Sequence, residues 1–190
     1  MKRGSSTGAS SARKRLVSQH SESNDATARL EAPVAADAPQ VHKLVSVCKP
    51  LDLNSTYAYL LLCHHFSGSC VVARFGQEIV GFISGYKLPT DPQTFFVWQV
   101  AVHPDTRGVG LGTHMLQHLL QRESLAATRF VQTTVSPSNQ ASRRMFQRLA
   151  ASVSAPINEE MLFERNAFGD EEHEEEVLLK IGPFARAAIA

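Results

Sequence analysis

The chain has 190 residues, a length that fits one domain with a short appendage. Its 19 Lys and Arg residues nearly balance its 18 Asp and Glu residues, so no excess of positive charge points to nucleic acid as a partner. No apolar run approaches the length that a membrane-spanning helix needs, and we therefore expect a soluble protein without a membrane partner.

The three cysteines are Cys48, Cys63 and Cys70. They lack the spacing of metal ligands and leave an odd thiol in any pairing scheme, which suits a reducing cytoplasm. We expect buried, inert thiols and no bound metal.

The first 40 residues differ in composition from the rest of the chain. They are rich in Ser, Ala and Thr and contain no Phe, Trp or Tyr. Such a segment has too little apolar surface to offset the entropy that ordering costs. We therefore expect a disordered extension over 1–40, a folded domain over 41–184 and a C-terminal tail over 185–190.

The first half of the predicted domain contains short strands and one helix. The run Val41–Val47 alternates enough for a strand. Asn54 or Ser55 can cap a helix that continues towards Phe66. The segments 70–74 and 78–86 are typical of two strands joined by a tight glycine-containing turn.

The stretch Phe95–Met115, FFVWQVAVHPDTRGVGLGTHM, organises the chain. A strand-like run ends at Val102, a glycine-rich turn follows from Arg107, and helical spacing begins near Leu111. Glycines let backbone N–H groups converge on an anion, and the helix N-terminus adds partial positive charge. This order predicts a phosphate-binding turn, although it has neither the Lys-Ser/Thr of a Walker loop nor the spacing of a dinucleotide fold.

A second strand and helix follow downstream. Residues 130–135 predict a strand, and a helix to about Ala150 shows Ala141, Met145 and Leu149 on one stripe. A last strand is expected over 177–181, after an ambiguous stretch around Met161. The pattern predicts an α+β fold in which helices flank a central mixed, mostly antiparallel sheet.

The turn R-x-x-G-x-G resembles the pyrophosphate loop of the GCN5-related N-acetyltransferases, whose co-substrate is acetyl-coenzyme A. Further segments, LDLNSTYAYLLLCHHF, VVARFGQEIVGFISGY, TTVSPSNQASRRMFQRLA and HEEEVLLKIGPF, resemble the diaminobutyrate acetyltransferase family of ectoine biosynthesis. The resemblance covers roughly residues 41–184. It implies acetyl transfer to the 4-amino group of L-2,4-diaminobutyrate, whose product is cyclised to a compatible solute against osmotic stress, and the superfamily's habit of pairing protomers implies a homodimer.

The resemblance also implies site residues. The cofactor-binding set is Val100, Val102, Arg107, Gly108, Gly110, Gly112 and Asn139. The substrate-binding set is Asp52, Tyr57 and Trp98, with Thr133 and Thr134 as weaker candidates, and the catalytic set is Glu176 and His173. Asp52 could instead be a local cap, and Asn139 could cap a helix without contacting the cofactor.

The chemistry of the substrate agrees with these residue types. An alkyl ammonium titrates near about pH 10, so a proton must leave before the nitrogen attacks the thioester. Glu176 is the first candidate acceptor, directly or through water, and His173 is the second. A backbone N–H near Val100–Val102 is expected to stabilise the oxyanion. Phe146 occupies the place where many superfamily members have a Tyr acid, so the general acid stays unassigned.

Three alternatives remain open from the sequence. The chain could acetylate another small amine, or it could bind acetyl-coenzyme A without catalysis. A covalent acetyl-cysteine route is a weaker competitor because the cysteines are distant in sequence from the cofactor motif, and we expect them to lie away from it.

Overall fold

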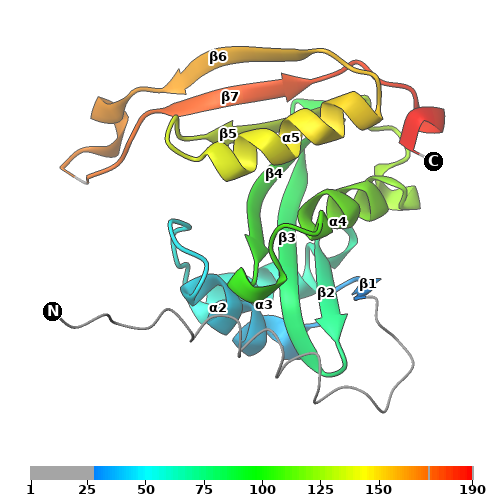
Figure 1. Ribbon diagram of the computed structural model, residues 1–190, viewed down its shortest axis with the longest axis vertical. Coiled ribbons are helices and arrows are strands. Elements are labelled where there is room, and N and C mark those ends of the chain that lie inside the picture. Colours follow the sequence, from blue (N-terminus) through cyan, green and yellow to red (C-terminus); the bar gives the residue numbers. More distant parts are fainter. Residues whose placement is uncertain (1–27, 171, 190) are drawn as a thin grey trace, which may run out of the picture.

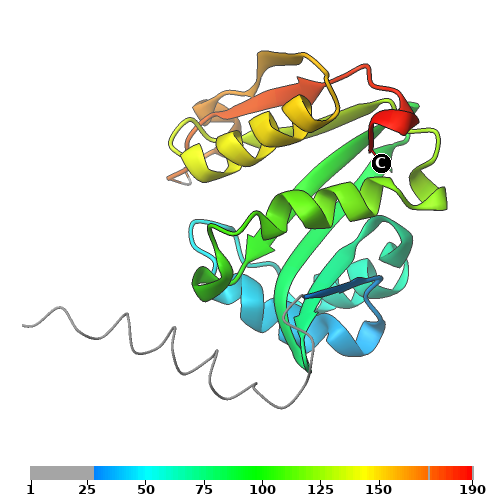
Figure 2. The ribbon, with the colours of Figure 1, turned by 45° about the vertical axis from the view of Figure 1, so that its right-hand side comes forward.

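The computed structural model describes residues 28–170 and 172–189. In this part of the chain seven strands form one sheet in the order β1-β2-β3-β4-β5-β7-β6, as Figures 1 and 2 show. All neighbouring strands are antiparallel except β4 and β5. The expected α+β fold with a mixed, mostly antiparallel sheet is therefore confirmed.

The elements have the following bounds. The strands are β1 (Arg29–Glu31), β2 (Val71–Phe75), β3 (Glu78–Leu88), β4 (Asp91–Val102), β5 (Phe130–Val135), β6 (Ile157–Phe163) and β7 (Glu176–Ile181). The α-helices are α2 (Ala38–Ser46), α3 (Thr56–His64), α4 (Leu111–Leu120) and α5 (Gln140–Ser152). Single 3-10 turns are η1 (Ala35–Asp37), η2 (Ser67–Ser69), η3 (Pro104–Thr106), η4 (Glu123–Leu125), η5 (Arg165–Phe168) and η6 (Arg186–Ile189).

The predicted boundary at residue 41 is wrong, because it falls inside α2. The run expected to be a strand over 41–47 is mostly helix, and β1 and η1 precede it. The buried residues of α2 are Ala38, Val41, Leu44 and Val45. Their spacing of three and four residues fits a helix better than an alternating strand. The predicted disorder of residues 1–27 lies outside the described residues.

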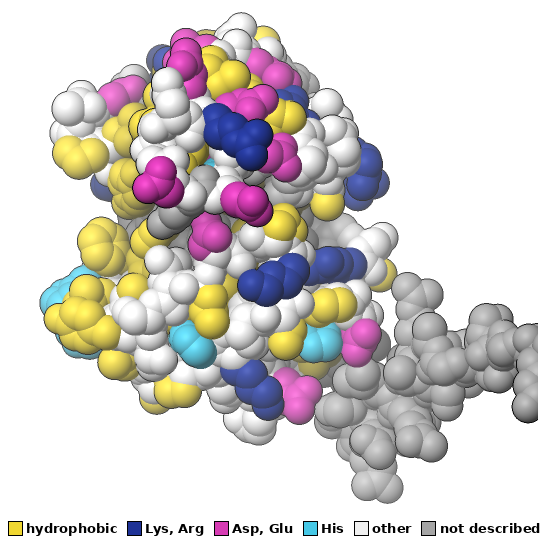
Figure 3. Space-filling view, turned by 90° about the vertical axis from the view of Figure 1, so that its left-hand side faces the viewer, with side chains coloured by type: hydrophobic (Ala, Val, Ile, Leu, Met, Phe, Trp, Pro, Cys, Tyr) yellow, Lys and Arg dark blue, Asp and Glu magenta, His cyan; other side chains and the backbone are white. Residues whose placement is uncertain are grey.

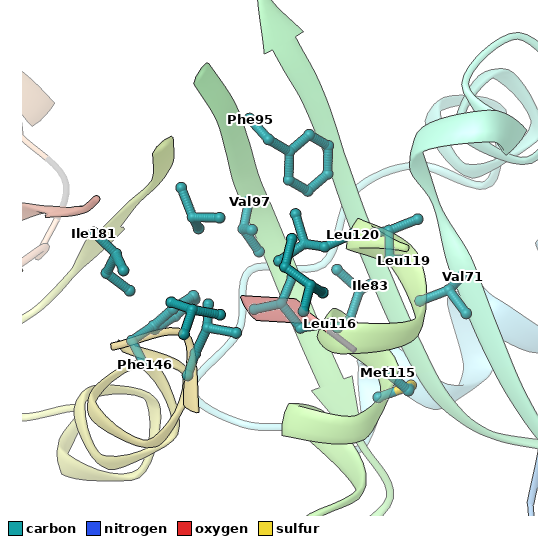
Figure 4. Close-up of a cluster of buried hydrophobic side chains, with 14 of the residues drawn as sticks. Val71, Ile83, Phe95, Val97, Met115, Leu116, Leu119, Leu120, Phe146 and Ile181 are labelled. Carbon is teal, nitrogen blue, oxygen red and sulfur yellow. The ribbon is translucent and has the colours of Figure 1, made fainter. Parts of the chain in front are cut away.

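Helices cover both faces of the sheet. Apolar residues of α4 and α5 pack on one face, with Met115, Leu116 and Leu119 fully buried against Phe95 and other strand residues; Figure 4 shows α4 directing these side chains towards the strands. Residues of α2 and α3 pack on the other face around Tyr59 and Phe82. Burial of each such side chain contributes roughly 1.5–3 kcal/mol to folding.

Strand β4 carries a β-bulge at Trp98. Ser84 pairs with Gln99 but Gly85 pairs with Val97, so Trp98 is the extra residue. Val97 and Val100 both pack towards the α4–α5 face, which places Trp98 and Gln99 together on the opposite face. The bulge thus changes which alternate residues of β4 face each way.

Strands β4 and β5 are paired along only part of their length. The pairing covers Thr94–Phe96 of β4 and Phe130–Gln132 of β5, whereas β4 continues to Val102 and β5 to Val135. The two strands diverge beyond the paired part (Figures 1 and 2). The unpaired end of β4 therefore offers free backbone groups.

The C-terminal residues are more ordered than the sequence indicated. Residues 185–190 were expected to be a tail, but η6 lies in this segment and Ile189 is buried. The Gln121 side-chain amide donates a 2.7 Å hydrogen bond to the Ile189 carbonyl. The C-terminal segment thus packs on the end of α4.

An ion network around the buried Asp37 carboxylate ties β1 and η1 to β2. The Arg74 guanidinium contacts Glu31 and lies 2.6 Å from Asp37 Oδ1. Burial lowers the pKa of Arg74, but the hydrogen bonds and charges of Asp37 and Glu31 outweigh it and raise the pKa overall. Asp37 Oδ2 also accepts the backbone N–H of Val34.

We predict that Arg74→Met lowers the free energy of unfolding by about 3 kcal/mol, because it leaves the buried Asp37 carboxylate without its cation. Urea denaturation measures the change. The matched control is Arg186→Met, which removes an exposed pair with Glu123 and is expected to cost less than about 1 kcal/mol. Equal effects of the two substitutions would contradict the role given to Arg74.

Candidate active site

The glycine-rich turn opens α4 in a conformation suited to an anion. Gly108 and Gly110 have φ angles of 88° and 83°, and Gly110 is the N-cap of α4 without a side-chain cap. A Cβ at either position would meet no atom within 4 Å. Glycine is thus required by the backbone conformation rather than by crowding. The first N–H groups of α4 have no capping side chain and remain available to a ligand.

A cavity of about 430 Å³ lies between this turn, the end of β4 and the start of α5. It is lined by all of the residues predicted to bind the cofactor, namely Val100, Val102, Arg107, Gly108, Gly110, Gly112 and Asn139. Asn139 also accepts the Ser142 N–H at 3.1 Å and caps α5, so capping and lining occur together.

Gly112 of α4 lies directly against the Met145 side chain of α5. A Cβ there would lie 2.8 Å from Met145 Sδ, which is too close for real atoms. Met145 and Ala141 both line the cavity. Of the predicted apolar stripe of α5, Leu149 is buried and Met145 packs against the core, whereas Ala141 is exposed. Phe146 and Ala150 are also buried.

The cavity is also lined by three basic residues that were not predicted from the sequence, namely Lys49, Arg144 and Arg148. Together with Arg107 they give the cavity a positive lining that suits a polyphosphate ligand. Arg144 and Arg148 are four residues apart, so they share one face of α5. That spacing beside Asn139 was a signal in the sequence.

A second cluster joins distant parts of the chain through His173. Its Nε2 lies 3.9 Å from Asp52 Oδ2 and 4.0 Å from Glu176 Oε1. The Asp52 side chain is 86% exposed, whereas that of Glu176 is 15% exposed. The structure therefore brings together the two predicted catalytic residues and one predicted substrate-binding residue.

The surroundings of His173 determine where its proton lies. Nδ1 is 2.6 Å from the Glu174 carbonyl, which can only accept a hydrogen bond, so Nδ1–H donates. Nε2, the other ring nitrogen, faces the two carboxylates, which would stabilise a proton bound there. The ring stacks on Phe168 with centroids 4.0 Å apart, which fixes its plane.

The acidic arm before β7 is attached to the loop that follows β5. Ser136 Oγ donates to Glu176 Oε1 at 2.9 Å, and the Ser138 N–H donates to Glu174 Oε2 at 3.1 Å. The hydrogen bonds from Ser138 lower the pKa of the Glu174 carboxyl. Ser136 was missed from the sequence, although its place directly after a strand was a signal. Figure 3 shows acidic side chains gathered on the upper part of the face that it displays.

Residues that line the cavity are neighbours in sequence of residues in or near the cluster around His173. Leu51 lines the cavity and directly precedes Asp52, while Ser138 directly precedes the cavity residue Asn139. On β4, Trp98 is two residues from the cavity residue Val100. The lining of the cavity and the cluster around His173 thus meet at the loops that precede α3 and α5.

The remaining predicted residues are placed differently from one another. Tyr57 lies in the first turn of α3, and both Tyr57 and Trp98 are exposed. Thr134 pairs with Leu178, so it shares a sheet face with Glu176 two residues away, whereas Thr133 is buried on the opposite face. Only Thr134 of this pair faces the same way as Glu176.

The cysteines are buried, as expected, but Cys48 is not distant from the cofactor motif. It lines the cavity, and its Sγ lies 3.4 Å from the Val102 carbonyl. Burial raises its pKa, against the lowering effect of Arg107. Burial also raises the pKa of Cys63 to about 11 and of Cys70 to about 12. These shifts disfavour the thiolate that a covalent acetyl-cysteine route needs.

We predict that iodoacetamide at pH 8 leaves the native thiols unmodified, because only a thiolate attacks and the folded protein holds the proton. Mass spectrometry should show modification after unfolding in urea. Stability that depends on the neutral thiols is present below their ordinary pKa of 9.0 and is lost as the pH rises from there through about 11. Rapid alkylation of native Cys63 would contradict the shift.

Within residues 28–170 and 172–189, no helix combines the length and the apolar character needed to cross a membrane. The same described residues contain no group of three or more His, Cys, Asp or Glu side chains that could hold a metal ion.

Comparison with known proteins agrees with this geometry. The model of the "Acetyltransferase (GNAT) family" matches residues 38–151. An L-2,4-diaminobutyric acid acetyltransferase from Bordetella parapertussis is 53% identical over 156 residues, which are 82% of this chain and 84% of the relative. The corresponding protein from Methylotuvimicrobium alcaliphilum is 44% identical, with 82% and 90% covered.

Solved structures extend the comparison. Diaminobutyrate acetyltransferase EctA from Paenibacillus lautus, in complex with its substrate L-2,4-diaminobutyric acid and coenzyme A, is 41% identical. It superimposes with a TM-score of 0.81 over 83% of this chain and 95% of that chain. Ard1 from Thermoplasma volcanium, at 18% identity and a TM-score of 0.66 over 82% of this chain and 98% of that chain, shares the fold. The chain therefore belongs to the acetyltransferase (GNAT) family and, within it, to the L-2,4-diaminobutyric acid acetyltransferases.

Proposed function

We propose that this chain transfers the acetyl group of acetyl-coenzyme A to the 4-amino group of L-2,4-diaminobutyrate. The product is N4-acetyl-L-2,4-diaminobutyrate, an intermediate of ectoine biosynthesis. One observation carries the proposal: the cluster of Asp52, His173 and Glu176 adjoins a positively lined cavity that opens at the N-terminus of α4. A diamine with one carboxylate and an anionic thioester co-substrate need these two environments side by side.

The cavity fits acetyl-coenzyme A. Arg107 and the uncapped start of α4 suit its pyrophosphate. The side chains of Val100 and Val102 form an apolar wall, and the unpaired end of β4 can bond an extended pantetheine arm. The bound coenzyme supplies the activated acyl group.

The substrate cluster fits the ammonium groups. The exposed Asp52 carboxylate can hold one of them in an ion pair. Glu176, more buried and fixed by Ser136, is placed to accept a proton from the attacking nitrogen, directly or through water. His173 Nε2 is the second acceptor, because a proton taken up there would lie close to both carboxylates. Trp98 and Tyr57 are proposed to shape the pocket.

Wider assignments follow the same proposal. A cytoplasmic site fits the free cysteines, and synthesis of a compatible solute under osmotic stress fits the ectoine pathway. A homodimer is supported by β6, an edge strand with Met161, Leu162 and Phe163 exposed, because an uncovered apolar edge strand favours association.

A thiol-release assay with acetyl-coenzyme A and L-2,4-diaminobutyrate tests the reaction, with NMR of the product. Acetyl on the 4-nitrogen is the expected result. Turnover of a polyamine with none of diaminobutyrate would instead support an acetyltransferase for another amine. Coenzyme binding without turnover of any amine would support a non-catalytic module.

We predict that Glu176→Gln lowers kcat by roughly 10²-fold or more and leaves the Kd for acetyl-coenzyme A unchanged, because the amide cannot accept the ammonium proton. Steady-state kinetics and calorimetry measure the two quantities. Glu172→Gln, an exposed member of the same acidic run, is the matched control and should be near normal. Near-normal turnover of the Glu176 variant would remove this residue from the mechanism and leave His173 as the acceptor.

We predict that Gly110→Val raises the KM for acetyl-coenzyme A at least about tenfold, and the KM for the amine much less, because a β-branched residue resists the positive φ of the phosphate turn. Gly169→Val is the control, since Gly169 also has a positive φ and open space but lies outside the cavity. Equal rises in both KM values would indicate general misfolding instead.

A further inference from the structure

The loop between α2 and α3 carries Asp52 and has little backbone support of its own. Among the described residues, no backbone-to-backbone hydrogen bond involves positions 52, 53 or 54. A loop without such bonds is free to shift unless side chains hold it. Two buried side chains from other elements supply the missing partners.

Gln99 of β4 is the first partner. Its Nε2 donates a 2.8 Å hydrogen bond to the backbone carbonyl of Asp52. Its Oε1 accepts a 3.3 Å hydrogen bond from the hydroxyl of Tyr59. Gln99 is 5% exposed and Tyr59 is fully buried, so both side chains are shielded from water.

Tyr59 of α3 is the second partner. Its hydroxyl oxygen accepts the backbone N–H of Asn54 at 3.4 Å, in addition to donating to Gln99. Its ring packs edge-on against Phe82 and His42, which fixes the hydroxyl in place. The network thus joins β4, α3 and both a carbonyl and an N–H of the loop.

The three elements in this network carry the three proposed substrate-binding groups. Trp98 directly precedes Gln99 and lies on the same sheet face because of the bulge. Tyr57 is two residues from Tyr59 in the first turn of α3. Asp52 has its backbone bonded while its carboxylate remains exposed and near His173.

We propose that Gln99, supported by Tyr59, is a positioning residue that holds the Asp52 loop against the Trp98 bulge and so fixes the site for the amine substrate. The inference rests on the proposed function, which places Asp52 in that site. Position 99 requires one group that donates and one that accepts, and a neutral amide supplies both. An apolar residue supplies neither, so the part-buried Asp52 carbonyl loses its donor and the Tyr59 O–H loses its acceptor.

The test substitutes Gln99→Met, which keeps an unbranched side chain of similar length but removes both hydrogen bonds. The expected result is a rise of about tenfold in the KM for the amine, with the KM for acetyl-coenzyme A changed less than about twofold, because only the loop that carries Asp52 is released. Tyr59→Phe, which keeps the ring, should raise the amine KM by a smaller factor. The double variant should show less than the product of the two effects, since both residues belong to one network.

Gln121→Met is the matched control. Gln121 also donates a side-chain amide hydrogen bond to a backbone carbonyl, at 2.7 Å to Ile189, but it lies at the end of α4 outside both clusters. It should leave both KM values unchanged. A rise in the amine KM for this control as large as that for Gln99→Met would overturn the proposal, as would an equal rise in both KM values for Gln99→Met.

Hydrogen exchange gives a reading that does not depend on the identity of the amine. The peptide that covers residues 51–58 should exchange faster in Gln99→Met than in the parent protein and in Gln121→Met. Faster exchange together with no turnover of diaminobutyrate by the parent protein would support the network and reject the proposed function. If exchange in Gln99→Met is unchanged and the parent protein does acetylate diaminobutyrate, the network alone is rejected.

Discussion

Between Phe95 and Val102, strand β4 has one residue more than the segment 81–87 of β3 with which it pairs, and both proposed binding regions depend on the change of alternation that results. Before the bulge, Phe95 and Val97 face α4 and α5; after it, Val100 and Val102 do so. Without the extra residue, Gln99 and Ala101 would face that way, and a buried amide would replace the apolar wall of the cavity. The same extra residue places Trp98 beside Gln99 on the other face.

The bulged strand β4 also diverges from β5 beyond a short paired part. A parallel pair normally satisfies its backbone groups along the whole ladder, but here the pairing ends at Phe96. The free edge lies beside the uncapped start of α4 and the basic residues of α5, so polar backbone groups and positive charge line one cavity. On the other side, the arm that carries His173 and Glu176 is tied to the loop after β5. The cluster of Asp52, His173 and Glu176 therefore joins the loop that precedes α3 to the loop that follows β5.

Local patterns made much of this arrangement predictable. The turn from Arg107 to Gly112 needs glycine at positive φ and precedes a helix, so its role follows from neighbouring residues alone. The sequence patterns that predicted β5 and the Ser55 cap of α3 are likewise local. The segment 41–47 was misjudged because a short apolar run fits a strand or a helix, and only packing on the sheet decides between them.

Contacts between distant residues account for what the sequence did not reveal. The bonds from Gln99 to Asp52 and from Ser136 to Glu176 each span at least 40 positions, and no local pattern specifies such partners. Cys48 was placed away from the cofactor motif for the same reason, since the end of α2 meets the end of β4 only after folding. The resemblance to a family named Asp52 and Glu176, but it did not indicate the residues that hold them.

The lack of a side chain at Gly112 leaves room for the Met145 thioether beside the cavity. A single methyl group there would come within 2.8 Å of Met145 Sδ, so the Met145 side chain lies directly against Gly112. The flexible thioether of Met145 can shift to make room, whereas the helix backbones cannot. A side chain added at residue 112 would therefore push Met145 into a new position and change the wall of the cavity without separating the two helices.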